Sequence, residues 1–391
     1  MSSDASPQSS NPNIQPIGEV TVSFDSFESG ALLPETTMAF DTGFDTSAPD
    51  LPDPTQYPAV VSYARREEVG RGGMAKIFSA DDPLLARFVA IKVSTADTSV
   101  PDTLFLREAE VLANLAHPNI PPIYSRGTDD LGRAFYSMKL IQGKTLQKIL
   151  KQLASGDPET TGTFTLQRLL EIFRKVCDGV AFAHAKGYLH RDLKPENIMV
   201  GEFGEVLVMD WGLAVAFGEH AQSDLPPAPP QEGEESGTIR LQGTPQYMSP
   251  EQVEGLVEGL DERSDVYALG GVLYAILTTN SPFSGTSLNE VLDRVRNGQI
   301  TPMPEVRVIT GPSGKTEVQM PEALRAVTFK AMALRRSDRY SSVNALVADI
   351  EAYQNGFATS AEQAGLLRQL TLLIKRNRLA SSLAAMLLVV A

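Results

Sequence analysis

The stretch His190-Arg-Asp-Leu-Lys-Pro-Glu-Asn197 gives the clearest information about the fold of this chain. It follows an apolar run with helical spacing that includes Val176, Val180 and Ala183. A short strand-like run, Glu205-Val-Leu-Val-Met-Asp210, comes after it. The stretch is therefore predicted to be a loop between two core elements, with polar side chains placed at the edges of those elements.

The polar residues of this loop are the types that phosphoryl transfer requires. Asp192 can accept a hydroxyl proton and orient the attacking oxygen, and Lys194 is placed to meet the transferred phosphate. Asn197 and Asp210 offer hard oxygen ligands for Mg²⁺, which bridges nucleotide phosphates. The pattern H-R-D-x-K-x-x-N followed by D-x-G is too specific for an ordinary polar loop, which is the alternative interpretation.

This pattern resembles the catalytic loop and metal-binding motif of the Ser/Thr protein kinase family. The resemblance implies a two-lobed α+β fold, in which an antiparallel sheet with one main helix precedes a larger, mostly helical lobe. The expected boundaries are a disordered acidic tail at 1–56, a kinase domain at 57–355 divided into lobes at 57–140 and 141–355, and a juxtamembrane segment at 356–391. Trp211, where the family more often has phenylalanine, is typical of some bacterial members.

A glycine-rich turn is the expected phosphate-binding element. Glycine lets backbone N–H groups approach phosphate oxygens, although ordinary hairpins also contain glycine. Ala75 stands where the family usually has a third glycine, so its methyl group is expected to tighten or tilt the turn. By resemblance, the nucleotide-binding residues here are Val69, Gly70, Arg71, Gly72, Gly73, Met74, Ala75, Lys76 and Ile77.

Further nucleotide contacts are implied by the runs around Lys92 and Met138. Lys92, in Val89-Ala90-Ile91-Lys92, could simply face solvent, but the resemblance implies that it holds the α- and β-phosphates. Its expected partner is Glu108, with Glu110 as the alternative, because an ammonium in a partly dry cleft needs a carboxylate. The resemblance also places the following residues at the adenine pocket and hinge: Ala90, Met138, Lys139 and Ile141.

Residues 213 to 243 form a long Pro-rich segment, which by resemblance is the activation segment. Its end, 243–251, matches the family anchor G-T-x-x-Y-x-[AS]-P-E, and Thr244 is expected to touch Asp192 and Lys194. Ser236 and Thr238 are candidate regulatory phosphorylation sites that Arg191 could pair with.

Two later residues are expected to be structural supports. By resemblance Asp265 braces the catalytic-loop backbone, although an acid at a helix start is also stabilised by the helix dipole alone. Arg339 is expected to pair with Glu251. The stretch 302–319 receives no assignment.

Composition excludes several classes of protein. The net charge of −14 argues against a nucleic-acid binder. The single cysteine, Cys177, excludes an internal disulfide framework; it is expected to be a buried apolar residue, with a redox sensor as the alternative. The polar, acidic start is unlike a signal peptide. The tail 1–56 is expected to be solvated, although its aromatic-acidic pieces could dock on a partner.

The C-terminal run 379–391 is apolar and follows the basic cluster Lys375-Arg-Asn-Arg378. It is too short to span a bilayer but resembles the start of a transmembrane helix with its cytoplasmic flank. We expect that the chain is truncated from a longer membrane-anchored protein with a cytoplasmic kinase domain, or that it ends in a membrane-contacting tail. The alternative is a helix that packs on the domain or on a second chain.

The sequence thus predicts an ATP- and Mg²⁺-dependent enzyme that phosphorylates Ser or Thr hydroxyls of proteins, with possible self-association and autophosphorylation. Two other classes stay open. A pseudokinase that acts as a nucleotide-binding scaffold is suggested only by Ala75 and Trp211. A small-molecule kinase is disfavoured by the intact segment 243–251, which serves peptide binding in the family.

Overall fold

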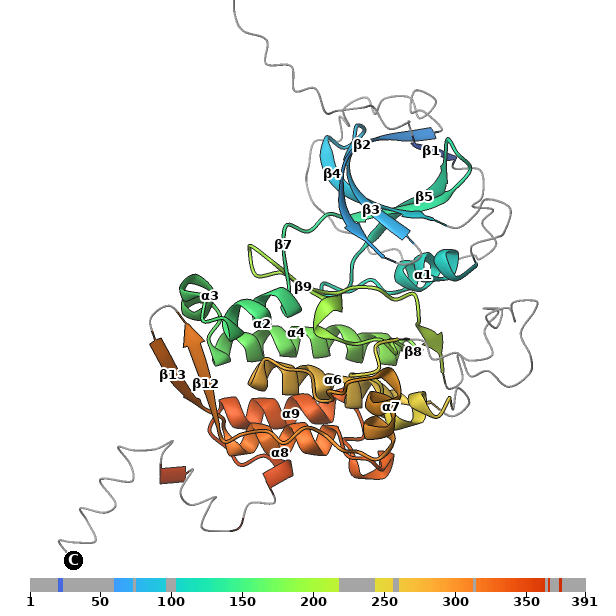
Figure 1. The fold of residues 1–391 in the computed structure, drawn as a ribbon. Coiled ribbons are helices and arrows are strands. Elements are labelled where there is room, and N and C mark those ends of the chain that lie inside the picture. Colours follow the sequence, from blue (N-terminus) through green and yellow to red (C-terminus); the bar gives the residue numbers. More distant parts are fainter. Residues whose placement is uncertain are drawn as a thin grey trace, which may run out of the picture. The chain divides into compact units, whose positions relative to one another are not determined.

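The structure is a computed structural model, and it describes the following residues: 20–23, 60–72, 75–95, 103–217, 243–255, 260–311, 314–362, 365 and 373–374. The chain divides into two compact units, with the main boundary between Leu140 and Ile141. The N-terminal unit contains Met1–Phe105 and Ile123–Leu140, and the C-terminal unit contains Leu106–Pro122 and Ile141–Ala391. The predicted two-lobed α+β architecture is confirmed (Figure 1).

Six antiparallel strands close a barrel in the N-terminal unit, in the order β1-β2-β3-β4-β6-β5 (Figure 1). They are β1 (Val20–Ser23), β2 (Val60–Arg71), β3 (Ala75–Asp82), β4 (Arg87–Ser94), β5 (Ile123–Asp129) and β6 (Ala134–Lys139). The first strand lies within the segment 1–56, for which the sequence predicts a disordered tail. Its Val-Thr-Val-Ser sequence has high β propensity, and it pairs with two neighbouring strands although the sequence on either side of it is polar. The rest of the segment lies outside the described residues.

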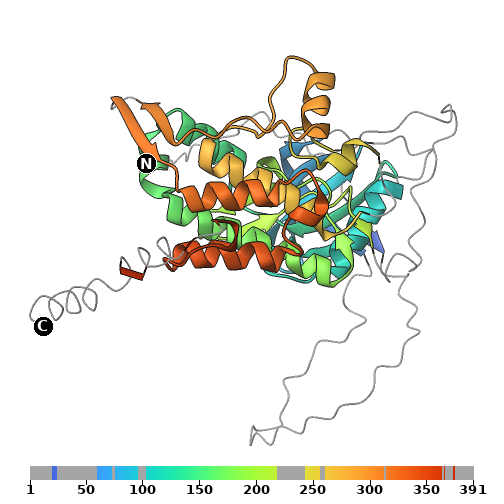
Figure 2. The ribbon, with the colours of Figure 1, turned by 90° about the horizontal axis from the view of Figure 1, so that it is seen from below.

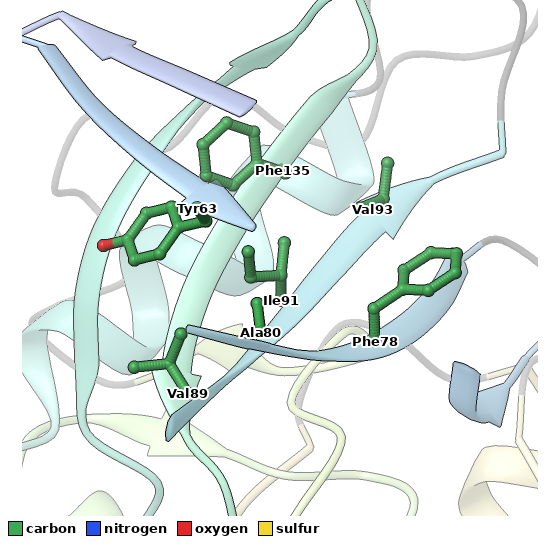
Figure 3. Close-up of a cluster of buried hydrophobic side chains, with 7 residues drawn as sticks. All are labelled: Tyr63, Phe78, Ala80, Val89, Ile91, Val93 and Phe135. Atoms are coloured by element: carbon green, nitrogen blue, oxygen red, sulfur yellow. The ribbon is translucent and has the colours of Figure 1, made fainter. Parts of the chain in front are cut away.

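The barrel core forms because apolar residues recur with the two-residue period of strands. Figure 3 shows the buried side chains gathered inside the barrel: Tyr63, Phe78, Ala80, Val89, Ile91, Val93 and Phe135. On β4, Ile91 and Val93 are buried on either side of half-buried Lys92, so the lysine side chain points to the opposite face.

The C-terminal unit is mostly helical. Its α-helices are α1 (Thr103–Asn114), α2 (Leu146–Ala154), α3 (Pro158–Thr163), α4 (Leu166–Ala185), α5 (Pro250–Val253), α6 (Glu262–Thr278), α7 (Leu288–Arg296), α8 (Glu322–Ala331) and α9 (Val343–Gln354), the first of them beginning in the N-terminal unit. Short 3₁₀ turns are η2 (Pro195–Asn197), η4 (Arg336–Asp338) and η5 (Ser360–Glu362). The apolar run with helical spacing that precedes the catalytic loop lies in α4, so its predicted helix is confirmed. Helix α3 was missed, and it begins because Asp157 caps Thr160 N–H and Pro158 takes the first helical position.

Helix α6 is the centre of the C-terminal unit. Every residue from Ser264 to Thr278 is buried, which fits a helix that is apolar on all sides and packed against neighbours around it. It packs against α4, α8 and α9, and α4 also packs against α9 (Figure 2). Cys177 is fully buried on α4 and burial raises the pKa of its thiol, which confirms its expected structural role.

In the part of the chain that the structure describes, five short strands lie before and after the catalytic loop, and two further strands form a separate hairpin. The strands are β7 (Gly143–Thr145), β8 (Tyr188–Leu189), β9 (Ile198–Gly201), β10 (Val206–Val208) and β11 (Val215–Ala216), paired as β10-β9-β7 and β11-β8. Strands β12 (Val306–Gly311) and β13 (Gly314–Gln319) pair in the stretch that received no assignment. Arg307 fixes this hairpin by donating to the Leu277 carbonyl at the end of α6.

Candidate active site

The Asp265 carboxylate of α6 binds the backbone of the loop between β8 and η2 through hydrogen bonds. This carboxylate accepts hydrogen bonds from the backbone N–H of His190 at 2.8 Å and of Arg191 at 2.9 Å, and from His184 Nε2 at 2.8 Å. Burial favours a higher pKa for Asp265, but these partners hold its pKa below the ordinary value. The predicted bracing role is confirmed. It allows Arg191 to adopt φ of 69°, a left-handed conformation that costs energy for a non-glycine residue.

The Asp192 carboxylate is buried and held by three donors. Lys194 Nζ donates to Oδ2 at 2.6 Å, Asn197 Nδ2 donates to the same oxygen at 3.1 Å, and the Thr244 N–H donates to Oδ1 at 3.0 Å. Lys194 Nζ also donates to Thr244 Oγ1 at 2.6 Å. The contacts predicted for Thr244 are therefore present, and they join the catalytic loop to the segment that starts at Gly243.

The β9–β10 hairpin brings Asn197 and Asp210 to the same end of two paired strands. Val208 pairs with Ile198, and the Met209 N–H donates to the Asn197 carbonyl at 2.7 Å. Asn197 Nδ2 donates to the Asp192 carbonyl at 2.9 Å, which leaves its amide oxygen as the atom suited to a cation. Asp210 is exposed and has φ of 63°.

The oxygen atoms of Asn197 and Asp210 suit Mg²⁺ better than they suit a metal ion whose ligands all come from the protein. Magnesium commonly takes one or two protein oxygens and completes its shell with water and substrate phosphates. Among the residues that the structure describes, no group of three or more His, Cys, Asp or Glu side chains could hold a metal ion. Asn197 and Asp210 stay the predicted ligands for Mg²⁺.

Trp211 fills the aromatic position of the D-W-G motif. It is buried, its Nε1 donates to the Val208 carbonyl at 2.9 Å, and its ring centroid lies 4.5 Å from that of His190. At the neighbouring Gly212, an added Cβ would lie 3.5 Å from Glu108 Oε2 and 3.7 Å from Asp210 Oδ1. Buried Glu108 and exposed Asp210 therefore flank Gly212, so the helix carboxylate lies beside the expected metal ligand.

Lys92 belongs to the N-terminal unit, whereas Glu108 belongs to the C-terminal unit. Within its own unit, Lys92 pairs in register with Ile77 and Tyr136, and its Nζ lies 5.9 Å from the Tyr136 ring centroid. The Lys92–Glu108 ion pair stays a prediction. Glu110 is exposed, as expected for the alternative partner.

The glycine-rich turn connects β2 to β3. The Gly72 N–H donates to the Ala75 carbonyl at 2.8 Å, and Gly73 and Met74 lie outside the described residues. A Cβ at Gly70 or Gly72 would meet only ordinary contacts at 3.6 Å or more. Packing among the described residues does not demand glycine at either position. Ala75, in contrast, is buried at the start of β3, where its methyl group packs in the unit.

The other predicted nucleotide-binding residues lie on several elements. Val69 and Arg71 are exposed near the end of β2, and Lys76 and Ile77 are half-buried on β3. Ala90 of β4 and Met138 of β6 are directly paired and both are buried. Lys139 ends β6 in the N-terminal unit, and Ile141 belongs to the C-terminal unit.

Arg339 and Glu251 form the predicted ion pair. The guanidinium donates to both carboxylate oxygens, at 2.7 and 2.9 Å, and Ser264 Oγ donates to the same carboxylate at 2.7 Å. Burial favours a higher pKa for Glu251, but Arg339 holds its pKa below the ordinary value. This pair fixes α5, which follows the Gly243–Ser249 segment, against the start of α6.

Sequence reasoning missed two polar supports of the catalytic loop. His184 holds Asp265 from α4, and Gln252 Nε2 donates to the Arg191 carbonyl at 2.8 Å. Both contacts join residues far apart in the chain, so helical spacing gave no signal for them. The position of Gln252 directly after the Pro-Glu of the family anchor was the available hint.

Comparison with known proteins agrees with this arrangement. A family model described as "Protein kinase domain" matches residues 63–350. A protein of Protochlamydia amoebophila (strain UWE25) named "Serine/threonine-protein kinase PknD" is 35% identical over 309 residues, which cover 75% of this chain and 30% of that protein. A protein of the same name from Chlamydia pneumoniae is 36% identical over 301 residues, 74% of this chain and 30% of that protein. The chain thus spans about 30% of the length of these relatives. The chain belongs to the protein kinase family, as its sequence resemblance predicted.

Proposed function

We propose that the chain is a Ser/Thr protein kinase that transfers the γ-phosphoryl group of ATP to hydroxyl groups of protein substrates. The observation that carries the proposal is the Asp192 carboxylate, which Lys194, Asn197 and Thr244 hold with three hydrogen bonds. A carboxylate fixed in this way can orient an incoming hydroxyl, and such positioning is the main catalytic contribution in phosphoryl transfer.

The step requires one proton acceptor and one stabilised phosphate. The substrate hydroxyl oxygen attacks the γ-phosphorus of ATP, the bond to the ADP oxygen breaks, and Asp192 accepts the hydroxyl proton. Lys194 Nζ, at 2.6 Å from Thr244 Oγ1, supplies a positive charge beside Asp192 for the transferred phosphate. Asn197 and Asp210 would hold Mg²⁺, which neutralises developing phosphate charge.

Nucleotide binding completes the proposal. Lys92 would hold the α- and β-phosphates, with Glu108 as its carboxylate partner. The N–H groups of the β2–β3 turn would approach the phosphates, and the absence of a packing need for glycine at Gly70 and Gly72 supports a ligand-related reason for these residues. Ala90 and Met138 would line the adenine pocket.

Intact mass after incubation with Mg-ATP tests the proposal. The parent chain should gain phosphate, while Asp192→Asn should not, and Glu202→Gln on the exposed β9–β10 turn serves as a matched control. A peptide substrate is included so that transfer in trans is also measured. If neither the parent nor the control transfers phosphate although both bind nucleotide, the proposal fails and the chain is a nucleotide-binding scaffold.

Two half-buried arginines support regulation by a phosphate in the segment 218–242, which lies outside the described residues. The Nε atoms of Arg107 and Arg191 are buried and have no hydrogen-bond partner among the residues that the structure describes. Burial and the charge of Arg107 lower the pKa of Arg191. Two close cations favour a phosphate, which Ser236 or Thr238 would carry after autophosphorylation. A Ser236→Ala, Thr238→Ala chain that transfers phosphate at the full rate would contradict this assignment.

A membrane contact through the C-terminus is the last part of the proposal. Its support is the basic cluster 375–378 followed by the apolar run 379–391, both outside the described residues. Among the helices of the described residues, none is long and apolar enough to span a bilayer. Flotation of the chain with vesicles of phosphatidylcholine and phosphatidylserine would support the contact. A chain that stays monodisperse in buffer and remains below the vesicles would contradict it.

A further inference from the structure

Strand β1 closes the barrel by pairing with two strands at once. Val20 is paired with Tyr63 of β2 and with Asp129 of β5, and both pairings are antiparallel. Strands β2 and β5 therefore run in the same direction, with β1 between them. Without β1, the sheet would have two open edges, and unpaired backbone N–H and C=O groups at such edges are sites where another strand can add.

The seam between β2 and β5 is held by buried side chains as well as by β1. The Tyr63 hydroxyl lies 2.8 Å from Ser125 Oγ, and Arg65 donates to Asp129 at 2.9 Å. The side chains of Arg65 and Asp129 are 2% and 3% exposed, so this ion pair is inside the unit. These contacts fix the spacing of β2 and β5 independently of the backbone of β1. The seam is therefore a preorganised acceptor for one extended segment.

The connection from β1 to the barrel differs from the connections between the other strands. Residues 83–86 suffice to link β3 to β4, whereas residues 24–59 separate β1 from β2. A long connection adds only slowly to the entropy cost of seating a strand, but it does not force the strand to pair within its own chain. The Val-Thr-Val-Ser sequence lacks charge and proline, and Glu19 and Asp25 flank it closely. An uncharged segment of four residues bounded by acidic residues thus matches a seam that pairs with four residues of β2.

We propose that the β2–β5 seam is a strand-binding site, which the chain fills with its own residues 20–23 and which the same residues of a second copy can fill instead. Exchange of an identical element between two copies keeps every backbone pairing and adds no new contact, so it is a low-cost route to a dimer. This inference does not depend on the proposed kinase activity, and its tests use no ATP.

Amide hydrogen exchange on the full chain tests whether the seam is filled. Thr21→Pro with Val22→Pro removes one N–H from each side of the strand, because successive N–H groups point to opposite neighbours. Exchange at Val60–Tyr63 and Thr128–Asp129 should become about tenfold faster or more, while Val89–Val93 of β4 should be unchanged. Ser29→Pro with Gly30→Pro is the matched control, which should leave exchange in all three regions unchanged. Equal exchange in the parent and the Thr21/Val22 variant would show that β1 is not seated and would overturn the proposal.

A labelled peptide of residues 17–26 tests whether the site accepts the strand from another molecule. Its fluorescence anisotropy should rise to saturation as the Thr21→Pro, Val22→Pro chain is added. The initial rise per unit concentration should be at least about tenfold smaller for the parent chain, whose site is filled. The same peptide with the two prolines should not bind. Equal binding to both chains, or no binding to the variant, would overturn exchange between copies.

Discussion

Thr244 illustrates how one side chain connects two distant segments at the catalytic loop. Its N–H donates to Asp192 and its Oγ1 accepts from Lys194. The side chain thereby fixes the lysine beside the carboxylate that would accept the substrate proton. Of the side-chain atoms of Thr244, the hydroxyl oxygen is the one that makes this contact.

Thr244→Val is expected to lower the rate of peptide phosphorylation by about tenfold or more, because a hydrogen bond to a charged group contributes about 1.5–3 kcal/mol. Thr244→Ser keeps the hydroxyl and should retain most of the rate. Initial rates at saturating ATP, with the affinity for ATP measured separately, give the comparison. Equal rates for the Ser and Val variants would show that the hydroxyl is not needed.

Asp265→Asn should destabilise the fold, because an amide cannot accept from all three donors that the carboxylate serves. Each buried donor left unpaired costs about 1–3 kcal/mol. Urea unfolding measures the loss, and Asp178→Asn, at an exposed position of α4, is the matched control. A loss no larger than that of the control would exclude a bracing role.

The same carboxylates predict a loss of stability in acid. The pKa values of Asp265 and Glu251 are below the ordinary values for these side chains, so in acid the folded chain binds fewer protons than the unfolded chain. Their contribution is present above the unfolded pKa values and is lost as pH falls through the lower folded values. We expect the free energy of unfolding to decrease as the pH drops below about 4.5. The decrease should be less steep for Asp265→Asn than for the parent chain. Parallel slopes in urea titrations across this range would contradict the prediction.

At the scale of elements, the ion pair between Glu251 and Arg339 joins α5 to the chain beyond η4. Arg339→Met leaves the Glu251 carboxylate buried without its cation, which should cost about 3–5 kcal/mol of unfolding free energy. Adding Glu251→Gln should recover part of that loss, because the buried charge is then removed. Urea unfolding of both single variants and the double variant provides the cycle. Strict additivity would mean that the two side chains do not stabilise each other.

The β9–β10 hairpin shows how the register of strand pairing brings predicted site residues together. Val208 pairs with Ile198, so the residues that follow β10 and precede β9 come to one end of the hairpin. Asn197 and Asp210 lie far enough apart in the chain that only this pairing brings them together. A shift of one residue would turn every side chain of a strand to the opposite face.

At the scale of the whole molecule, a ligand that binds only the folded chain raises its stability. Mg-ATP at 100 times its dissociation constant should add about 2.7 kcal/mol to the free energy of unfolding. Asp210→Asn, or removal of Mg²⁺ with EDTA, should reduce this gain, whereas Glu202→Gln should keep it. Thermal unfolding with and without Mg-ATP makes the comparison. An undiminished gain in Asp210→Asn would exclude Asp210 as a metal ligand.

Short motifs of this chain indicated the family, and the resemblance to that family implied the two-unit architecture and the roles of the polar residues around Asp192. They did so because phosphoryl transfer requires particular side chains at close spacing, and strands and helices impose their own periods on apolar residues. The tertiary structure alone decided the contacts of His184 and Gln252, the pairing of residues 20–23 with β2 and β5, and the β12–β13 hairpin. Each of these depends on backbone or side-chain partners elsewhere in the fold, and their pairing energy is not contained in local propensity.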